Sequence, residues 1–195
     1  MMSLQEKYKK EAVPALMKQF GYSNANQVPR IEKATINCGF GKMVSGKTKE
    51  EQRKIQEAVT RDLTQICGQH AVVTKARKSI ASFKIREGQN IGAKITLRRS
   101  RMYDFLERTI TAALPRSRDF QGISAKGVDQ DGNLAFGIKE HIAFPEISPE
   151  KINFIFSFEI TVTTTARNRE EGLALFQALG FPVKKIENEK VRMKK

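Results

Sequence analysis

Three runs of alternating apolar and polar residues constrain the fold of this chain more than any other feature. The segments 33–40, 91–98 and 152–162 each place an apolar side chain at every second position. Such alternation indicates strands that bury one face and expose the other, because successive side chains of a strand point to opposite sides of its sheet. The outward-facing residues of the first two strands are Lys33, Thr35, Asn37, Lys94, Thr96 and Arg98.

Apolar residues at helical spacing predict four helices between and around the strands. They cover residues 4–20, 49–67, 102–113 and 168–180, and shorter alternating runs at 72–74 and 134–138 predict two more strands. Strands of this one-sided kind belong to antiparallel or mixed sheets with helices on one side. The sequence therefore predicts an α+β fold with a mostly antiparallel sheet, helices packed on one face, and an open polar face.

Prolines and capping residues set the expected ends of these helices. Pro14 lies inside the first helix and should kink or divide it, and the third helix should stop at Pro115. Asn168 and Glu171 have the spacing of a helix start, and Gly180 follows the last apolar residue of the final helix. We expect a single domain over residues 1–185 and a charged tail at 186–195.

Composition fits a folded protein without a membrane segment. Of the 195 residues, 39% are hydrophobic and twelve are phenylalanine, which is enough for a core. No run approaches the roughly 18 apolar residues that a membrane span requires, and the first ten residues are polar, unlike a signal peptide. A cytoplasmic protein is the expectation.

The residues that most often carry catalysis or bind metals do not cluster in this sequence. Cys38 and Cys67 fit no metal spacing and are expected to be buried thiols, and His70 and His141 are isolated. The segment 129–133 begins like a calcium loop but lacks the glycine at its sixth position, so a hairpin turn is favoured. We expect no enzyme activity, no metal, no cofactor and no small-molecule substrate.

Residues 41–48 match the phosphate-loop pattern letter for letter, with the sequence GKMVSGKT. This pattern predicts a nucleotide site in which Lys47 binds the outer phosphates and Thr48 binds Mg²⁺. However, the preceding strand alternates, whereas the strand before a phosphate loop is normally apolar on both faces. Thr48 and Glu51 also have capping-box spacing, which explains the segment as a helix entry. An NTPase that acts on RNA is thus the competing hypothesis, and an RNA phosphate contact by this loop stays open.

Positive charge is concentrated in one part of the chain. The net charge is +14, and residues 75–101 hold nine Lys/Arg and a single acid, Glu87. The second half of this segment includes Lys94, Thr96 and Arg98, which suit phosphates and 2′-hydroxyls. The charges of its first half do not alternate cleanly, which predicts a long loop that projects from the sheet. The polar and basic residues of that loop are Lys75, Arg77, Lys78, Ser79, Lys84 and Arg86. Charge this localised indicates a nucleic-acid partner.

Several motifs strongly resemble the bacterial family of large-ribosomal-subunit protein five. They are VPRIEK at 28–33, TKARKS at 74–79, FKIR at 83–86, LPRSRDF at 114–120, FPEI at 144–147, ITVTTTA at 160–166 and EEG at 170–172. The match runs in order from about residue 4 to residue 185. Two departures are a long, lysine-rich segment at 41–48 and the tail at 186–195.

The resemblance implies a structural RNA-binding protein of the central protuberance in the large ribosomal subunit. It implies that the open sheet face binds 5S rRNA, that the basic loop contacts P-site tRNA, and that 23S rRNA is a further partner. The segment 139–149 would approach a small-subunit protein at an inter-subunit bridge. It overlaps residues 143–151, which contain Pro145 and Pro149 and are expected to form an exposed loop. The bridge residues implied are Lys139, Glu140, His141 and Glu146.

Overall fold

The computed structural model describes residues 2–118, 120–148, 150, 152 and 154–184, so the expected tail at 186–195 lies outside the described residues. Five strands form one sheet in which every neighbouring pair is antiparallel, in the order β2-β3-β1-β5-β4. The strands are β1 (Ile31–Gly39), β2 (Val72–Lys75), β3 (Asn90–Leu97), β4 (Leu134–Ile138) and β5 (Phe158–Thr164). The α+β fold with an antiparallel sheet is confirmed.

The helices follow the predicted segments closely. They are α1 (Leu4–Lys7), α2 (Val13–Phe20), α3 (Gly41–Val44), α4 (Lys49–Cys67), α5 (Arg99–Arg108), α6 (Leu114–Arg116) and α7 (Arg169–Leu179). Short 3-10 turns cover Ala25–Gln27, Ala81–Phe83, Ala125–Gly127 and His141–Ala143. In the described part of the chain, no helix combines the length and the apolar character that crossing a bilayer requires.

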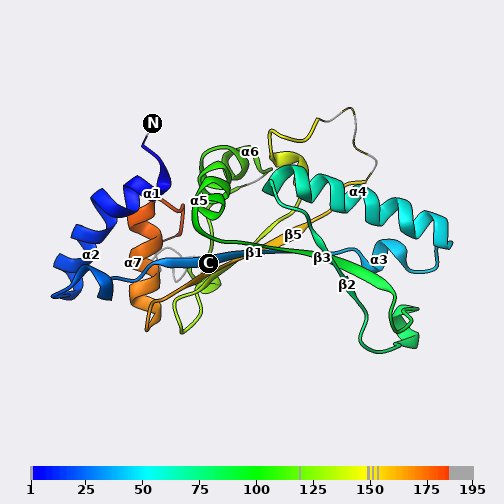
Figure 1. Cartoon of the computed structure of the whole chain (residues 1–195), viewed down its shortest axis with the longest axis horizontal. Helices are drawn as coiled ribbons and strands as arrows, with labels where there is room; N and C mark the ends of the chain where they lie inside the picture. Colours follow the sequence, from blue (N-terminus) through cyan, green and yellow to red (C-terminus); the bar gives the residue numbers. More distant parts are fainter. Residues whose placement is uncertain (1, 119, 149, 151, 153, 185–195) are drawn as a thin grey trace, which may run out of the picture.

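Helices α4 and α5 lie along one side of the sheet (Figure 1), and the apolar side chains of the strands share one core with those of these helices. Ala34, Ile36 and Cys38 of β1 are completely buried, as the alternation predicted. From α4, Val59, Leu63 and Ile66 join the same core. Burial on this side alone leaves the opposite side of the central strands for polar residues.

The two prolines that fall within predicted helices, Pro14 and Pro115, each lie just after a π-helical segment, and the helix continues past each of them. The segments Tyr8–Ala12 and Thr109–Ala113 are π-helical, and Pro14 and Pro115 follow each of them by two residues. Proline lacks an N–H and clashes with the carbonyl one turn earlier, and the wider π turn accommodates this. The helix expected to stop at Pro115 ends at Arg116, one residue later, so the predicted end is confirmed to within one residue.

The segment 152–162 forms a shorter strand than its alternation predicts. Strand β5 begins only at Phe158, although Phe156 before it is buried and its carbonyl accepts a hydrogen bond from the backbone N–H of His141. Phe144 and Ile147 are also buried, so the loop expected to be exposed at 143–151 is anchored in the core. Periodicity reports burial on one face, but it does not show whether a neighbouring strand is present.

Helix α7 packs closely against the turn that precedes β4. The turn contains Gly132, and a Cβ on Gly172 of α7 would lie 2.5 Å from the Gly132 Cα atom. The hydroxyl of Thr164 donates to the Gly132 carbonyl oxygen at 2.9 Å, which fixes the same turn against β5. Only a residue without a side chain allows this helix to approach the turn.

We expect Gly172→Ala to lower the free energy of unfolding by about 2 kcal/mol, because its methyl group would overlap backbone atoms that other contacts hold in place. Alanine favours a helix more than glycine does, so a loss of stability reports the clash alone. Urea denaturation measures the effect. Gly137→Ala is the matched control, since nothing lies within 4 Å of a Cβ there; equal stability of the two variants would contradict the packing argument.

Candidate nucleic-acid interface

The pairing of β1 with β3 brings the predicted outward-facing residues together. Asn37 lies opposite Lys94, and Thr35 lies opposite Thr96. Arg98, at the end of β3, reaches Glu32 at the start of β1. The two strands that the sequence predicted separately are thus neighbours, and their polar side chains form one surface, named here the polar face.

Strand β5 adds a third row of side chains that the sequence analysis did not assign to this surface. Glu159 lies opposite Asn37, Thr161 opposite Thr35, and Thr163 opposite Lys33. All three alternate with the buried Phe158, Ile160 and Val162, so the signal was present in the alternation of this strand. The sequence did not show which strand pairs with β5, and without that pairing these residues could not be assigned to the polar face.

A hollow of about 510 Å³ interrupts the polar face where β1, β5 and β4 meet. It is lined by Asn37, Glu159 and Lys139 together with Gly39 and Gly137. A Cβ at either glycine would meet no atom within 4 Å, so the missing side chains leave room for a ligand to approach the backbone. The polar face is therefore uneven, with a recess at the end nearest Lys139.

Charge on the polar face is balanced more than the sequence alone suggests. Arg98 forms an ion pair with Glu32 at 3.3 Å, and both side chains are about half exposed. Glu159 stands in the same row as Lys94. Apart from Lys33, hydroxyls and an amide occupy the remaining positions of the three strands. Such a surface is suited to hydrogen bonds with ribose hydroxyls and phosphates in fixed positions more than to general attraction of a polyanion.

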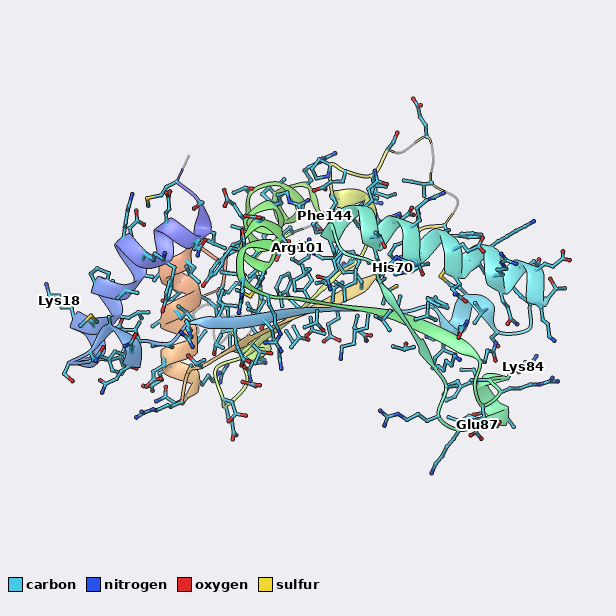
Figure 2. All side chains as sticks on the ribbon, viewed as in Figure 1. Lys18, His70, Lys84, Glu87, Arg101 and Phe144 are labelled. Atoms are coloured by element: carbon cyan, nitrogen blue, oxygen red, sulfur yellow. The ribbon has the colours of Figure 1, made fainter. Side chains whose placement is uncertain are left out.

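The basic loop is an ordered extension of the β2–β3 hairpin. The backbone N–H of Ala76 donates to the Gln89 carbonyl at 2.8 Å, and Ile80 and Ile85 exchange two further hydrogen bonds. The Ser79 hydroxyl accepts from the Glu87 N–H at 2.9 Å. Figure 2 shows Lys84 and Glu87 at the end of this hairpin, away from the helices on the sheet. The six polar and basic residues predicted for this loop, Lys75, Arg77, Lys78, Ser79, Lys84 and Arg86, are all exposed.

The tip of this basic hairpin also exposes apolar side chains. Phe83 is 60% exposed and Ile80 is 45% exposed, which is unusual for residues of this size. The residues predicted for RNA contact from the sequence were polar or basic and did not include Phe83. An exposed phenyl ring among cations can stack on a nucleotide base or lie against a ribose.

The segment around the expected bridge divides into exposed and buried residues. Lys139 and Glu140 are exposed, and with Arg116 and Arg118 they line a hollow of about 400 Å³. The side chain of His141 is completely buried. His141 therefore lies beneath this surface and makes no direct contact with a partner, which corrects its expected place in the bridge.

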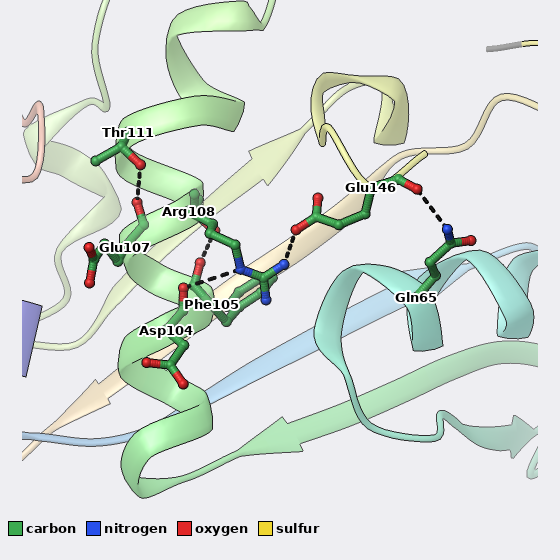
Figure 3. Close-up of polar contacts among 8 residues, drawn as sticks. Gln65, Asp104, Phe105, Glu107, Arg108, Thr111 and Glu146 are labelled. Carbon is green, nitrogen blue, oxygen red and sulfur yellow. Dashed lines mark hydrogen bonds and ion pairs between the residues drawn. The ribbon is translucent and has the colours of Figure 1, made fainter. Parts of the chain in front are cut away.

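Glu146 also holds the fold together. Its carboxylate forms an ion pair with Arg108 of α5, and its backbone carbonyl accepts a hydrogen bond from Gln65 of α4 at 2.7 Å, as Figure 3 shows. The loop is thereby attached to two helices at a single residue. Glu146 is mostly buried, so we assign it to positioning the loop that carries Lys139 and Glu140.

Buried His141 provides a second attachment of this loop to α4. Its ring stacks on Phe156 with 4.0 Å between centroids, and its Nε2 lies 3.6 Å from Asp62 Oδ2. Asp62 in turn accepts a hydrogen bond from Arg61 at 3.0 Å. Burial lowers the pKa of His141 below its ordinary value, although the nearby Asp62 carboxylate opposes this shift.

The phosphate-loop match does not form a nucleotide site. Its strand, β1, pairs with antiparallel neighbours on both sides. The backbone N–H groups of Ser45 and Lys47 donate to carbonyls within the segment, and that of Thr48 donates to Glu51. These amides therefore cannot surround a phosphate, and the capping box of Thr48 and Glu51 predicted from their spacing is confirmed. The arrangement of this segment therefore gives the competing NTPase hypothesis no support.

Two other expectations from the sequence are confirmed. Both cysteines are buried free thiols, and burial raises the pKa of each to about 12. The segment 129–133 is a hairpin turn in which the Asp129 carboxylate accepts hydrogen bonds from Asn133, and an antiparallel bridge of Val128 with Leu134 closes it. Among the residues that the structure describes, no group of three or more His, Cys, Asp or Glu side chains is arranged to hold a metal ion.

Comparisons with known proteins agree with the motifs and the fold. Residues 24–86 match the family model of ribosomal protein L5, and residues 90–183 match the model of the C-terminus of the same ribosomal family. The large ribosomal subunit protein uL5 of Desulfotalea psychrophila is 50% identical over 185 residues, which are 95% of this chain and all of that protein. The uL5 protein of Shewanella sp. is 51% identical with the same coverage. The chain belongs to the ribosomal protein L5 family.

Both parts of the L5 match contribute to the single sheet, because the first supplies β1 and β2 and the second supplies β3, β4 and β5. As an L5-family protein of the large subunit, the chain is associated with the ribosome and has ribosomal RNA as a partner. This family is structural rather than enzymatic.

We expect the stability of this L5 protein to fall as the pH drops below about 6.5, the ordinary pKa of histidine. Because burial disfavours the charged ring, the unfolded chain takes up the proton more readily, so stability is full above that pH and declines below it. Thermal melts between pH 7.5 and 5.5 measure the dependence. His141→Gln should reduce it and His70→Gln, at an exposed position, should preserve it; the same pH dependence in both variants would contradict this role.

Proposed function

We propose that the polar face binds 5S rRNA in the central protuberance, and that 23S rRNA is a further partner of the protein. The observation that supports this best is the register of β1, which aligns Thr35 with Thr96 and Thr161 and aligns Asn37 with Lys94 and Glu159. Side chains held by paired strands have fixed spacing, and fixed spacing is what recognition of a folded RNA requires. The binding residues are Lys33, Thr35, Asn37, Lys94, Thr96 and Arg98, with Thr161 and Thr163 added from β5.

The same proposal assigns the basic hairpin to P-site tRNA. Its cations are exposed at the end of a hydrogen-bonded extension that projects beyond the sheet (Figure 1), so they can reach an RNA that the polar face does not contact. Arg77 and Lys78 lie between the end of β2 and the tip, close in sequence to the exposed Phe83. The hairpin combines charge with an apolar tip, which suits a contact that forms and breaks during translation.

For the inter-subunit bridge, we propose the exposed residues Lys139 and Glu140 as the contact with a small-subunit protein. Arg116 and Arg118 line the same hollow and extend this surface. The attachments of Glu146 and His141 to α4 and α5 hold the backbone of the bridge segment in place. A surface that contacts another subunit keeps its geometry when the segment beneath it is held rigidly.

Lys94→Ala is expected to weaken binding to 5S rRNA by about fivefold to tenfold, because it removes one charged contact from the polar face. Arg98→Ala should have a smaller effect on affinity, because the ion pair with Glu32 already neutralises part of the Arg98 charge. Filter binding across a series of salt concentrations measures both. Lys10→Ala, at an exposed lysine of the segment Tyr8–Ala12 and outside the strands of the polar face, is the control; unchanged affinity in both Lys94→Ala and Arg98→Ala would remove the polar face from the proposal.

Replacing Arg77 and Lys78 together by alanine should leave 5S rRNA binding intact and weaken the contact with P-site tRNA. The reason is that both residues lie on the hairpin, outside the paired rows of the polar face. Binding of tRNA to ribosomes that carry the variant measures the second effect, and filter binding measures the first. An equal loss of 5S rRNA affinity would show that the two surfaces act as one.

A further inference from the structure

A cleft separates the start of α4 from the basic hairpin, on the side of the sheet that the helices cover. It has a volume of about 940 Å³ and is lined by Lys49 and Gln52 on one wall and by Lys84, Arg86 and Gln89 on the other. A second hollow of about 440 Å³ shares Lys49, Gln52 and Gln89 with it and extends it along α4. The two form one groove that is far larger than a single phosphate needs.

The larger hollow of the groove is electropositive, whereas the smaller hollow includes the Arg53–Glu57 ion pair. In the part of the chain that the structure describes, Lys49, Lys84 and Arg86 take part in no ion pair, and Glu87 is the one acid along the larger hollow. Lys47 adds a further cation at the entrance, where its ammonium lies 5.8 Å from the centre of the Phe154 ring. Facing cations in a hollow repel one another unless an anion lies between them.

Hydrogen bonds hold the two walls at a fixed separation. At one end the Ser45 hydroxyl donates to the Phe83 carbonyl at 3.0 Å, and at the other end the Asn90 amide donates to Gln56 at 2.7 Å. Gln52 is itself fixed by a 2.8 Å bond to the Lys47 carbonyl. A groove whose width is set before binding loses little entropy when a ligand enters.

We propose that this groove binds the sugar–phosphate backbone of an RNA segment other than the one on the polar face. The cations suit phosphates, and the side-chain amides of Gln52 and Gln89 suit ribose hydroxyls. No aromatic ring is among the residues that line the larger hollow, so the contact reads the backbone and not the bases. Lys47 of the phosphate-loop match thereby contributes to phosphate binding through its side chain, although the backbone amides of that segment do not.

The groove and the polar face are separate because they lie on opposite sides of β3. The groove is bounded by α4, which lies along one side of the sheet (Figure 1). Lys94 and Thr96 alternate along β3 with the buried Ala93, Ile95 and Leu97, so they belong to the other side. Lys84 and Arg86 also belong to the hairpin assigned to tRNA, so the RNA in the groove is either a ribosomal segment or part of the tRNA. Lys49 belongs to the groove alone, and it is therefore the residue to test.

Lys49→Glu is expected to weaken binding of the full chain to deproteinised 23S rRNA or to tRNA by about tenfold and to lower the salt dependence of log K by about one. Its affinity for 5S rRNA should not change. Lys10→Glu makes the same charge change at the opposite end of the molecule and should alter none of the three affinities. Filter binding over a series of potassium chloride concentrations measures all of them.

A photo-crosslinking residue in place of Gln52 identifies the source of the RNA. A crosslink to 23S rRNA in large subunits without tRNA supports a ribosomal segment, and one that requires bound tRNA supports the tRNA. Unchanged affinity of Lys49→Glu for all three RNAs, or crosslinks to protein alone, would overturn the inference. An equal loss of 5S rRNA affinity would overturn it too, whereas the Lys94→Ala result bears only on the polar face.

Discussion

The antiparallel pairing of β1 with β3 and β5 is the constraint on which the rest of the structure depends. Side chains alternate along a strand, so a shift of one residue would turn the polar row of β1 into the core and its apolar row into solvent. The buried row of Ala34, Ile36 and Cys38 prevents that shift. In the same register, Thr35 aligns with Thr96 and Thr161 on the opposite side. The packing that stabilises the protein therefore also sets the geometry of the surface proposed for RNA.

Polar contacts on the helical side determine where the loops lie. Glu146 joins its loop to α4 and α5, and His141 joins the same segment to Asp62. The hairpin is fixed in a similar way, because Ser45 bonds to Phe83. Each of these contacts uses a residue that a sequence pattern would place on an exposed loop. Buried polar groups that are paired hold a loop in one conformation. A surface that binds a large, rigid partner requires its loops to be held in one conformation.

The limits of prediction from sequence follow from particular residues. The ends of α4 and the caps of α7 were predictable, because Thr48 and Asn168 bond to amides three residues away. The length of β5 was not, because alternation continues to Ile152 after the neighbouring strand has ended. Burial of His141 was also unpredictable, since it depends on Asp62, which lies far away in the sequence. Local bonds are visible in a sequence, whereas partners brought together by folding are not.

By itself, the sequence determined the fold class, the one-sided strands, the concentration of positive charge in residues 75–101 and the resemblance to the L5 family. These depend on periodicity and composition, which are properties of neighbouring residues. The tertiary structure alone decided that β5 joins the polar face, that the phosphate-loop amides are already bonded, and that Lys49 faces Lys84 and Arg86 across a groove. Each of these three features depends on which distant segments of the chain become neighbours. The strand register and the packing of the whole chain determine which segments those are.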